Sequence, residues 1–265
     1  MGNTSTRIPC GRMSNNDTFI KKTLLCKQLS LRENIPYIEK EPHMGTVFLL
    51  GDSTCAQKSP ESYPETGWGM CFNEHLAEGW SLDNRSINGR STKMFLDEGA
   101  FAAIMIDLRL GDYCIIQFGH NENKLDEERH TDPWTSYTAN LLYMAESITR
   151  KAAHPVLVSS ITRRNFLDGK YLMHTLGEYP QAMEAVARKL MLPFVDLTTP
   201  TRKKVEELGS LKSREYFMHF DAGLYPRYPE GDADDTHLRP EGAKAVATLL
   251  ATLLKKQYPE LPFLR

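Results

Sequence analysis

DYCIIQF, residues 112–118, is a continuous apolar stretch that ends abruptly in the polar segment GHNE, residues 119–122. The stretch is short and rich in β-branched and aromatic residues, which predicts a parallel β-strand covered on both faces. Other segments have a similar character: TVFLL at 46–50, PVLVSS at 155–160, PFVDL at 193–197 and, more weakly, SLDN at 81–84. The sequence therefore predicts a mainly parallel sheet of about five strands.

Amphipathic segments alternate with these strands. Apolar residues at intervals of three or four predict two helices, one containing Trp134, Tyr137, Leu141, Met144, Ala145 and Ile148, the other containing Val246, Leu249, Leu250, Leu253 and Leu254. Thr131 or Asp132 caps the first helix before Pro133, and Pro240 opens the second. This alternation predicts an α/β fold, a three-layer α/β/α sandwich, whose ligands bind beyond the carboxyl ends of the strands.

The composition is that of an ordinary globular protein. The chain has 265 residues, of which 41% are hydrophobic and 25% are charged, and this suits a single large domain. We assign that domain to residues 44–265. Residues 1–43 lack the alternation of strands and helices, so we interpret them as an N-terminal extension whose role the sequence does not define.

Charge and cysteine content exclude several classes of partner. The formal net charge of −2 argues against a nucleic acid or an anionic membrane, which favour clustered Lys and Arg. No apolar run approaches the roughly 18 residues of a membrane span, and no signal-peptide core is visible. The five cysteines are scattered without a CxxC pair, which predicts neither a disulfide framework nor a zinc ribbon. We expect a cytoplasmic protein that binds a small or neutral molecule.

The tripeptide GDS, residues 51–53, follows the first predicted strand, where Gly51 permits a tight turn. Ser53 is either a turn residue or a nucleophile on the ligand side of the sheet. The Gly-x-Ser-x-Gly elbow of the α/β-hydrolases occurs nowhere in the chain. Cys55 is an alternative nucleophile, but a cysteine that enters a helix more often packs as a small apolar residue. Ser53 is therefore the candidate nucleophile if other segments supply a base and an anion site.

Two segments at the ends of predicted strands offer donors for an oxyanion. In NRSINGRST, residues 84–92, Gly89 lets a backbone N–H approach an anion without a side chain in the way. The alternative is a solvated loop with a helix cap at Ser91 or Thr92. In GHNE, Asn121 can donate two N–H bonds without carrying charge, which suits an oxyanion site.

A metal site at the same strand end is not expected. His120 and Glu122 are metal-ligand types, but the chain has no second pair at H-x-x-x-H spacing. We interpret both residues as loop or turn residues.

DADDTHLRPEGA, residues 232–243, precedes the last predicted helix. In a loop or turn, Asp234 and His237 are close enough for the carboxylate to bond one imidazole nitrogen while the other nitrogen faces outward. Asp232 and Asp235 compete with Asp234 by proximity, and the spacing favours Asp234. The alternative is an acidic surface run with a helix-capping residue.

Together these blocks resemble the SGNH (GDSL-type) hydrolases in order and approximate spacing. More narrowly, roughly residues 46–258 resemble the rhamnogalacturonan acetylesterase group, in the segments FLLGDST, GWG at 67–69, NRSINGRS, IIQFGHNE, RRNFLDGK at 163–170, VDL at 195–197 and DDTHL. Ser86 and Glu122 differ from the residues common in that group. Neither position has a catalytic role in the pattern, although both could alter the pocket wall.

The resemblance implies an SGNH hydrolase fold and a serine esterase mechanism that requires no metal or organic cofactor. The implied catalytic residues are Ser53, His237 and Asp234, and the implied oxyanion hole consists of Ser53, Gly89 and Asn121. The implied reaction removes O-acetyl groups from pectin-derived rhamnogalacturonan oligosaccharides through an acyl-enzyme. The expected partner is therefore an acetylated oligosaccharide.

Substrate-binding candidates are Arg163, Arg164 and Tyr225. One of the arginines could meet a galacturonate carboxylate, although a surface arginine pair is an equal alternative, and Tyr225 could form part of the rim. Two other functions stay open. One is an esterase for acetylated xylan, lipid-like or aryl esters, and the other is a carbohydrate-binding protein without catalysis on the same fold.

Overall fold

The computed structural model describes residues 44–265, and the predicted extension at 1–43 lies outside the described residues. A five-stranded sheet has the order β2-β1-β3-β4-β7, and every neighbouring pair is parallel. Its strands are β1 (Gly45–Gly51), β2 (Trp80–Asn84), β3 (Tyr113–Gln117), β4 (His154–Val158) and β7 (Phe194–Val195). The predicted α/β fold with a parallel sheet of about five strands is confirmed, including the weak strand near residue 82.

The register of the sheet sets the position of the candidate site. Leu49 of β1 lies opposite Asn84 of β2 and Ile115 of β3, and Gly51 lies opposite Gln117. The carboxyl ends of β1 and β3 therefore lie side by side. As a result, the residues that follow Gly51 and Gln117 meet at one edge of the sheet.

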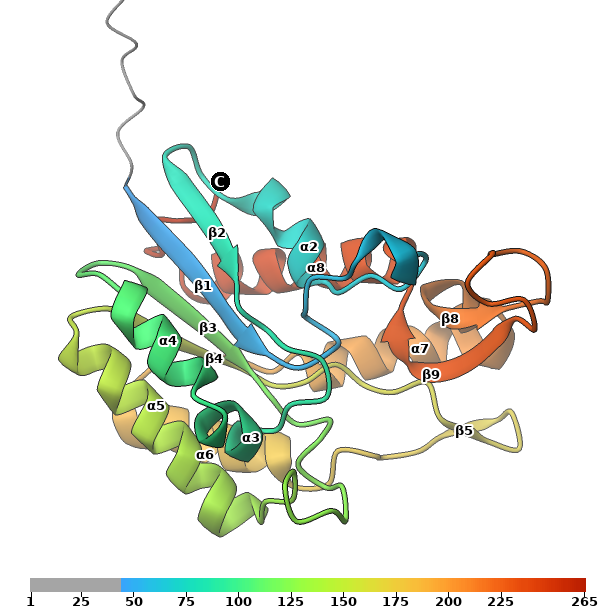
Figure 1. Ribbon diagram of the computed structural model, residues 1–265, viewed down its shortest axis with the longest axis horizontal. Helices are drawn as coiled ribbons and strands as arrows, with labels where there is room; N and C mark the ends of the chain where they lie inside the picture. Colours follow the sequence, from blue (N-terminus) through green and yellow to red (C-terminus); the bar gives the residue numbers. More distant parts are fainter. Residues whose placement is uncertain (1–43) are drawn as a thin grey trace, which may run out of the picture. The chain divides into compact units, whose positions relative to one another are not determined.

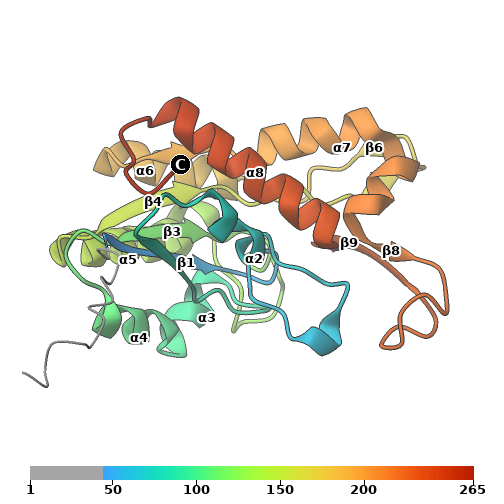
Figure 2. The ribbon, with the colours of Figure 1, turned by 90° about the horizontal axis from the view of Figure 1, so that it is seen from above.

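Helices cover both faces of this sheet (Figures 1 and 2). Val47 and Leu49 face a core shared with α2 (Gly69–Phe72), α7 (Thr198–Lys212) and α8 (Pro240–Gln257). Phe48 and Leu50 point to the opposite core, which is formed with α3 (Thr92–Asp97), α4 (Ala100–Asp107), α5 (Thr138–Arg150) and α6 (Tyr179–Leu190). Side chains alternate across a strand, so the continuous apolar strands supply both cores.

The first predicted helix begins with a π-helical turn at Pro133–Tyr137 before α5. Asp132, not Thr131, is the N-cap, because its side chain accepts hydrogen bonds from the backbone N–H groups of Trp134 and Thr135. Trp134 is 49% exposed and does not join the apolar stripe predicted for it. A π-helical turn is wider than an α-helical turn, so a residue within it, such as Trp134, loses the helical phase of the residues that follow it.

Two antiparallel pairs lie outside the main sheet: β5 (Phe166–Leu167) with β6 (Tyr171–Leu172), and β8 (Phe217–Phe220) with β9 (Asp232–Leu238). Figure 1 shows both pairs on the side of the main sheet where β1 and β2 end. The prediction that Asp234 and His237 lie in a loop or turn was wrong, because both belong to β9. β9 pairs with only one neighbouring strand and is partly exposed, so its residues are mostly polar. It therefore lacks the apolar pattern by which the other strands were predicted.

Short 3₁₀ turns complete the structure at Pro60–Ser62, Asn73–His75 and Ser213–Tyr216. Within residues 44–265, no helix combines the length and the apolar character required to cross a membrane.

Candidate active site

Ser53 stands at the point where the chain leaves β1. The Asp52 carbonyl accepts hydrogen bonds from the N–H groups of Cys55 at 3.1 Å and Ala56 at 3.0 Å, which closes a tight turn around Ser53. A Cβ on Gly51 would lie 2.8 Å from the Gln117 carbonyl oxygen, so the close approach of β1 and β3 requires glycine here. The turn therefore presents the Ser53 hydroxyl at the carboxyl end of the sheet.

His237 lies between Ser53 and Asp234. Its Nε2 is 2.8 Å from Ser53 Oγ, and its Nδ1 is 2.5 Å from Asp234 Oδ2. With Nδ1 protonated, the ring donates to the carboxylate and Nε2 accepts the serine proton. This is the geometry that a nucleophile, a base and an orienting carboxylate need.

A bulge in β9 explains how residues three apart on one strand make this contact. Met218 pairs with Asp234, but the next residue back on β8, Phe217, pairs with Leu238. The extra residues of β9 between these pairs loop out, and the Asp234 carboxylate accepts the N–H groups of Thr236 at 2.6 Å and His237 at 3.1 Å. The bulge thus turns the ring back onto the carboxylate.

The two ionisable side chains shift each other in opposite directions. Burial raises the pKa of Asp234, but the hydrogen bond and charge of His237, with two backbone N–H donors, outweigh burial and hold that pKa well below its usual value. Burial lowers the pKa of His237, whereas the hydrogen bond and charge of Asp234 raise it, and the net direction is upward. The site therefore favours the charge that His237 acquires when it takes a proton.

The competing aspartates have other partners. Asp235 Oδ1 lies 2.5 Å from a guanidinium nitrogen of Arg164 and 2.6 Å from Nε2 of His219. Asp232 accepts the N–H of Ala233 at 2.7 Å. Of the three acidic residues weighed from the sequence, Asp234 is the one in contact with the His237 ring.

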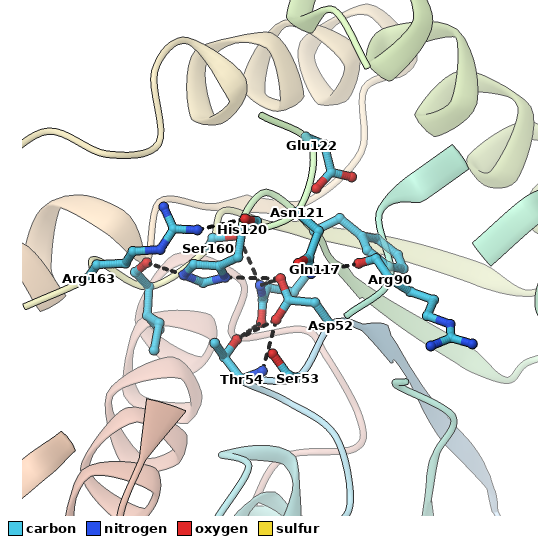
Figure 3. A network of polar contacts seen from close by, with 12 residues as sticks. Asp52, Ser53, Thr54, Arg90, Gln117, His120, Asn121, Glu122, Ser160 and Arg163 are labelled. Carbon is cyan, nitrogen blue, oxygen red and sulfur yellow. Dashed lines mark hydrogen bonds and ion pairs between the residues drawn. The ribbon is translucent and has the colours of Figure 1, made fainter. Parts of the chain in front are cut away.

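Asn121 and Gly89 come together from two different loops. Asn121 is 7% exposed, and its side-chain amide donates to the Arg90 carbonyl at 3.1 Å (Figure 3). Gly89 has φ +76°, a left-handed conformation that disfavours residues with a side chain. Because an amide NH₂ has two hydrogens, Asn121 retains one donor after the bond to Arg90.

Asp52 and His120 form a buried, hydrogen-bonded pair behind Ser53 (Figure 3). His120 Nε2 lies 3.0 Å from the Ile161 carbonyl, which can only accept, and Nδ1 lies 3.0 Å from Asp52 Oδ2. Burial raises the pKa of Asp52, but His120 and two bonds from Thr54 outweigh burial and lower it to about 2. Asp52 is therefore a carboxylate.

The pairing of His120 with Asp52 was not predicted from the sequence, where the alternatives for His120 were a metal ligand and a turn residue. The sequence did contain a signal for this pair. Asp52 and His120 both follow strands that are expected to be neighbours, so an acidic and a basic side chain could have been expected to meet there. In the structure the pair ties the Ser53 turn to the segment that carries Asn121. No group of three His, Cys, Asp or Glu residues in the described part of the chain is arranged to hold a metal ion.

Glu122 points away from the polar network around Asp52 (Figure 3). Its Oε1 accepts the N–H of Thr92 at 2.6 Å, and its Oε2 is buried without a hydrogen-bond partner. Burial raises its pKa to about 8, so the carboxyl group is largely neutral at pH 7. Glu122 joins the β3 end to the start of α3 and so supports the loop that contains Gly89.

The alternative nucleophile, Cys55, is part of the hydrophobic core, where it is 1% exposed. Burial raises the pKa of its thiol far above the usual range. A neutral, inaccessible thiol is a poor nucleophile, so the geometry favours Ser53.

The candidate substrate residues have different surroundings. Arg163 is partly buried and donates to the carbonyls of His120 at 2.6 Å and Thr175 at 3.3 Å. Arg164 is 6% exposed, and Asp235, with other protein groups, occupies its guanidinium. Tyr225 is partly buried and packs edge-to-face against Tyr63, with ring centroids 5.7 Å apart. Arg163 and Tyr225 thus stay candidates, whereas Arg164 is engaged within the protein.

The chain is similar in sequence and in structure to known proteins. The GDSL-like lipase/acylhydrolase family matches residues 49–245. The chain is 40% identical to rhamnogalacturonan acetylesterase RhgT of Bacillus subtilis (strain 168), over 77% of this chain and 87% of the relative. It is 33% identical to the probable rhamnogalacturonan acetylesterase YesY of the same organism, over 79% and 92%. The crystal structure of B. subtilis YxiM superposes with a TM-score of 0.69 at 21% identity, over 82% of this chain and 57% of that one.

Proposed function

The chain belongs to the GDSL-like lipase/acylhydrolase family, and from this premise we propose that it is a serine esterase that removes O-acetyl groups from rhamnogalacturonan oligosaccharides. The observation that carries the proposal is the contact of His237 with both Ser53, at 2.8 Å, and Asp234, at 2.5 Å. The names of two relatives, each matched over more than three quarters of this chain, support the substrate class.

In the proposed reaction, Ser53 Oγ attacks the carbonyl carbon of the acetyl group, and its proton passes to Nε2 of His237. The tetrahedral intermediate collapses when the C–O bond to the sugar breaks, and His237 gives its proton to the departing sugar oxygen. A water molecule then attacks the acetyl-Ser53 ester, with His237 again as the base. Acetate leaves and the serine hydroxyl is restored.

The proposed oxyanion hole consists of the backbone N–H groups of Ser53 and Gly89 and the free N–H of Asn121. The bond from Asn121 to the Arg90 carbonyl supports this assignment, because it fixes the amide beside the turn that contains Gly89. Donors held in place before the reaction act most strongly on the charge that develops in the transition state, and one such donor is typically worth about 3–4 kcal/mol.

Arg163 and Tyr225 are the proposed substrate contacts. Arg163 has donors beyond those used for the His120 and Thr175 carbonyls, so it can meet a galacturonate carboxylate. Tyr225, beside Tyr63, offers an aromatic surface at the rim. Arg164 is left out because Asp235 neutralises its guanidinium.

We also propose that the enzyme works in the cytoplasm on imported oligosaccharides. Cys55, Cys71 and Cys114 are free thiols, which fits a reducing compartment. Cell fractionation with an antibody against the chain tests this location. Recovery with secreted proteins would contradict it.

Mass spectrometry of acetylated rhamnogalacturonan fragments before and after incubation tests the function. We expect acetyl groups to be lost as free acetate with the wild-type enzyme and retained with Ser53→Ala. Acetylated xylo-oligosaccharides and longer acyl esters, tested in parallel, reveal whether another acyl donor is preferred. Binding of the fragments without acetate release would favour a carbohydrate-binding protein, and labelling of Ser53 by a serine-reactive phosphonate would oppose that reading.

A further inference from the structure

Lys58 is a buried lysine next to the proposed active site, and the reaction described above gives it no role. Its side chain is 2% exposed, and its ammonium lies 2.6 Å from Glu65 Oε1 and 2.7 Å from Asn88 Oδ1. A buried charge is costly unless it is paired and hydrogen-bonded, and these two contacts meet that need. Each contact leads to a different part of the site.

The contact with Asn88 reaches the turn that presents the Gly89 amide. The turn spans residues 87–90 and is closed by a long hydrogen bond, 3.4 Å, from the Arg90 N–H to the Ile87 carbonyl. A Cβ built on Gly89 would meet nothing within 4 Å, so packing does not hold this point of the turn. The bond from Lys58 to Asn88 therefore restrains the peptide next to the Gly89 N–H.

The contact with Glu65 reaches the catalytic base. The same Oε1 that binds Lys58 lies 4.0 Å from Nε2 of His237, the nitrogen that faces Ser53. The N–H of Thr66 donates to the Leu238 carbonyl at 2.8 Å, which fastens the Glu65 segment to the end of β9. A carboxylate held there attracts the proton that Nε2 takes from Ser53.

Charged groups from two elements act on the His237 ring. Asp234 on β9 and Glu65 in the segment after β1 raise its pKa, and Lys58 lowers it. Tyr228, in the β8–β9 connection, has a pKa that burial and the charges of Glu65 and Asp234 raise, and its hydroxyl donates to the Ser62 carbonyl at 3.3 Å. Glu65 and Lys58 thus have opposite effects on one ring, whereas only Lys58 also contacts the turn at Gly89.

We propose that Lys58 and Glu65 form a positioning pair for ester hydrolysis. Lys58 holds the Gly89 turn so that its amide faces the oxyanion, and Glu65 stabilises the imidazolium of His237. This inference rests on the proposed serine esterase function. It assigns separate roles to the two members, which substitution can distinguish.

The test uses the full chain and a neutral alkyl ester, glycerol triacetate, with acetate quantified from about pH 5 to about pH 9. Glu65→Gln should shift the acidic limb of kcat/KM downward by about 0.5–1 pH unit, and Lys58→Met should shift it upward by a similar amount. Lys58→Met should also lower kcat about 10–100-fold with a smaller change in KM. The double variant should regain the wild-type limb within about 0.3 pH unit while kcat stays low.

Asn88→Ala removes the contact with the turn and leaves both charges in place. It should lower kcat about 10-fold without moving the acidic limb of the pH profile. This variant also tests the contact with the turn if Lys58→Met does not fold. Matched controls are Glu206→Gln, which alters an ion pair with Arg202, and Lys244→Met, which alters an ion pair with Glu74. Both controls should behave like the wild type.

Two results would overturn the positioning pair while the proposed function stands: acidic limbs that coincide in Glu65→Gln and wild type, or full kcat in both Lys58→Met and Asn88→Ala. Ser53→Ala separates the two ideas. Its inactivity beside an active wild type supports the esterase regardless of the Lys58 results, whereas its retained activity would overturn the esterase mechanism and the pair together.

Discussion

The Nδ1 of His237 lies 2.5 Å from Oδ2 of Asp234, although both residues belong to the same strand, β9. On a regular strand, residues three apart point to opposite faces. The bulge opposite Phe217 and Met218 overcomes this and brings the ring onto the carboxylate. The hairpin of β8 and β9 is therefore as necessary to the site as the sheet that carries Ser53.

Asp234→Asn and Asp235→Asn should have different effects. Asp234→Asn leaves the His237 ring in the wrong tautomer, so kcat should fall about 10⁴-fold. Asp235→Asn should instead lower the free energy of unfolding by about 1–3 kcal/mol, because the buried Arg164 loses its counter-charge. Steady-state kinetics and urea unfolding measure the two effects. A larger loss of kcat in Asp235→Asn than in Asp234→Asn would make Asp235, and not Asp234, the carboxylate that orients His237.

Asn121→Ala should lower kcat roughly 10²–10³-fold and change KM less, because the removed N–H acts on the charge of the transition state. Kinetics on acetylated oligosaccharide check this. Asn123→Ala is a matched control, since the Asn123 amide donates to the Thr175 carbonyl instead. An increase in KM with kcat unchanged would make Asn121 a ground-state binding residue.

Activity should fall on acidification with a midpoint above pH 6.5, the usual pKa of histidine, because His237 must be neutral to act as base and its pKa is raised. The contribution of His237 to folding stability depends on pH in the opposite direction to activity. The raised pKa contributes stability in full below pH 6.5, and this contribution is lost as the pH rises through the folded value. The profile of kcat/KM measures the midpoint, and a flat profile from about pH 4 to about pH 8 would contradict His237 as base.

Glu122→Gln should make the protein less sensitive to alkali. Burial raises the Glu122 pKa from 4.5 to about 8, so the folded state binds more protons than the unfolded state between these values, and stability falls as the pH rises between them. Glutamine removes this loss, and the variant should gain roughly 3–4 kcal/mol relative to wild type between pH 5 and pH 8. Urea unfolding at both pH values tests this, and parallel curves would refute a neutral Glu122.

Arg163→Gln should raise KM about 10-fold on acetylated oligosaccharides that contain galacturonate, because a charge-assisted contact is lost. On neutral acetylated xylo-oligosaccharides, KM should change little. Arg164→Gln is the matched control and should lower stability without this selectivity, because Arg164 is bound to Asp235. Equal changes of KM on both substrates would show that Arg163 does not bind the galacturonate carboxylate.

The local pattern of the sequence was enough to predict the layers of the fold. Continuous apolar strands separated by amphipathic helices leave few arrangements other than a parallel sheet covered on both faces. The same pattern placed Ser53 and Asn121 after strands, and the register that sets Gly51 opposite Gln117 brings these segments together. Where the pattern failed, at β9, the strand is polar and contacts only one partner.

The sequence by itself determined the fold class, because periodicity and apolar runs are properties of neighbouring residues. Only the tertiary structure decided that a strand bulge brings the Asp234 carboxylate to His237, that Asp235 engages Arg164, and that Lys58 joins Glu65 to Asn88. These relationships depend on the bulge of one strand and on contacts between segments distant in the chain. Distances of a few ångströms across the fold set them, and no local spacing encodes such distances.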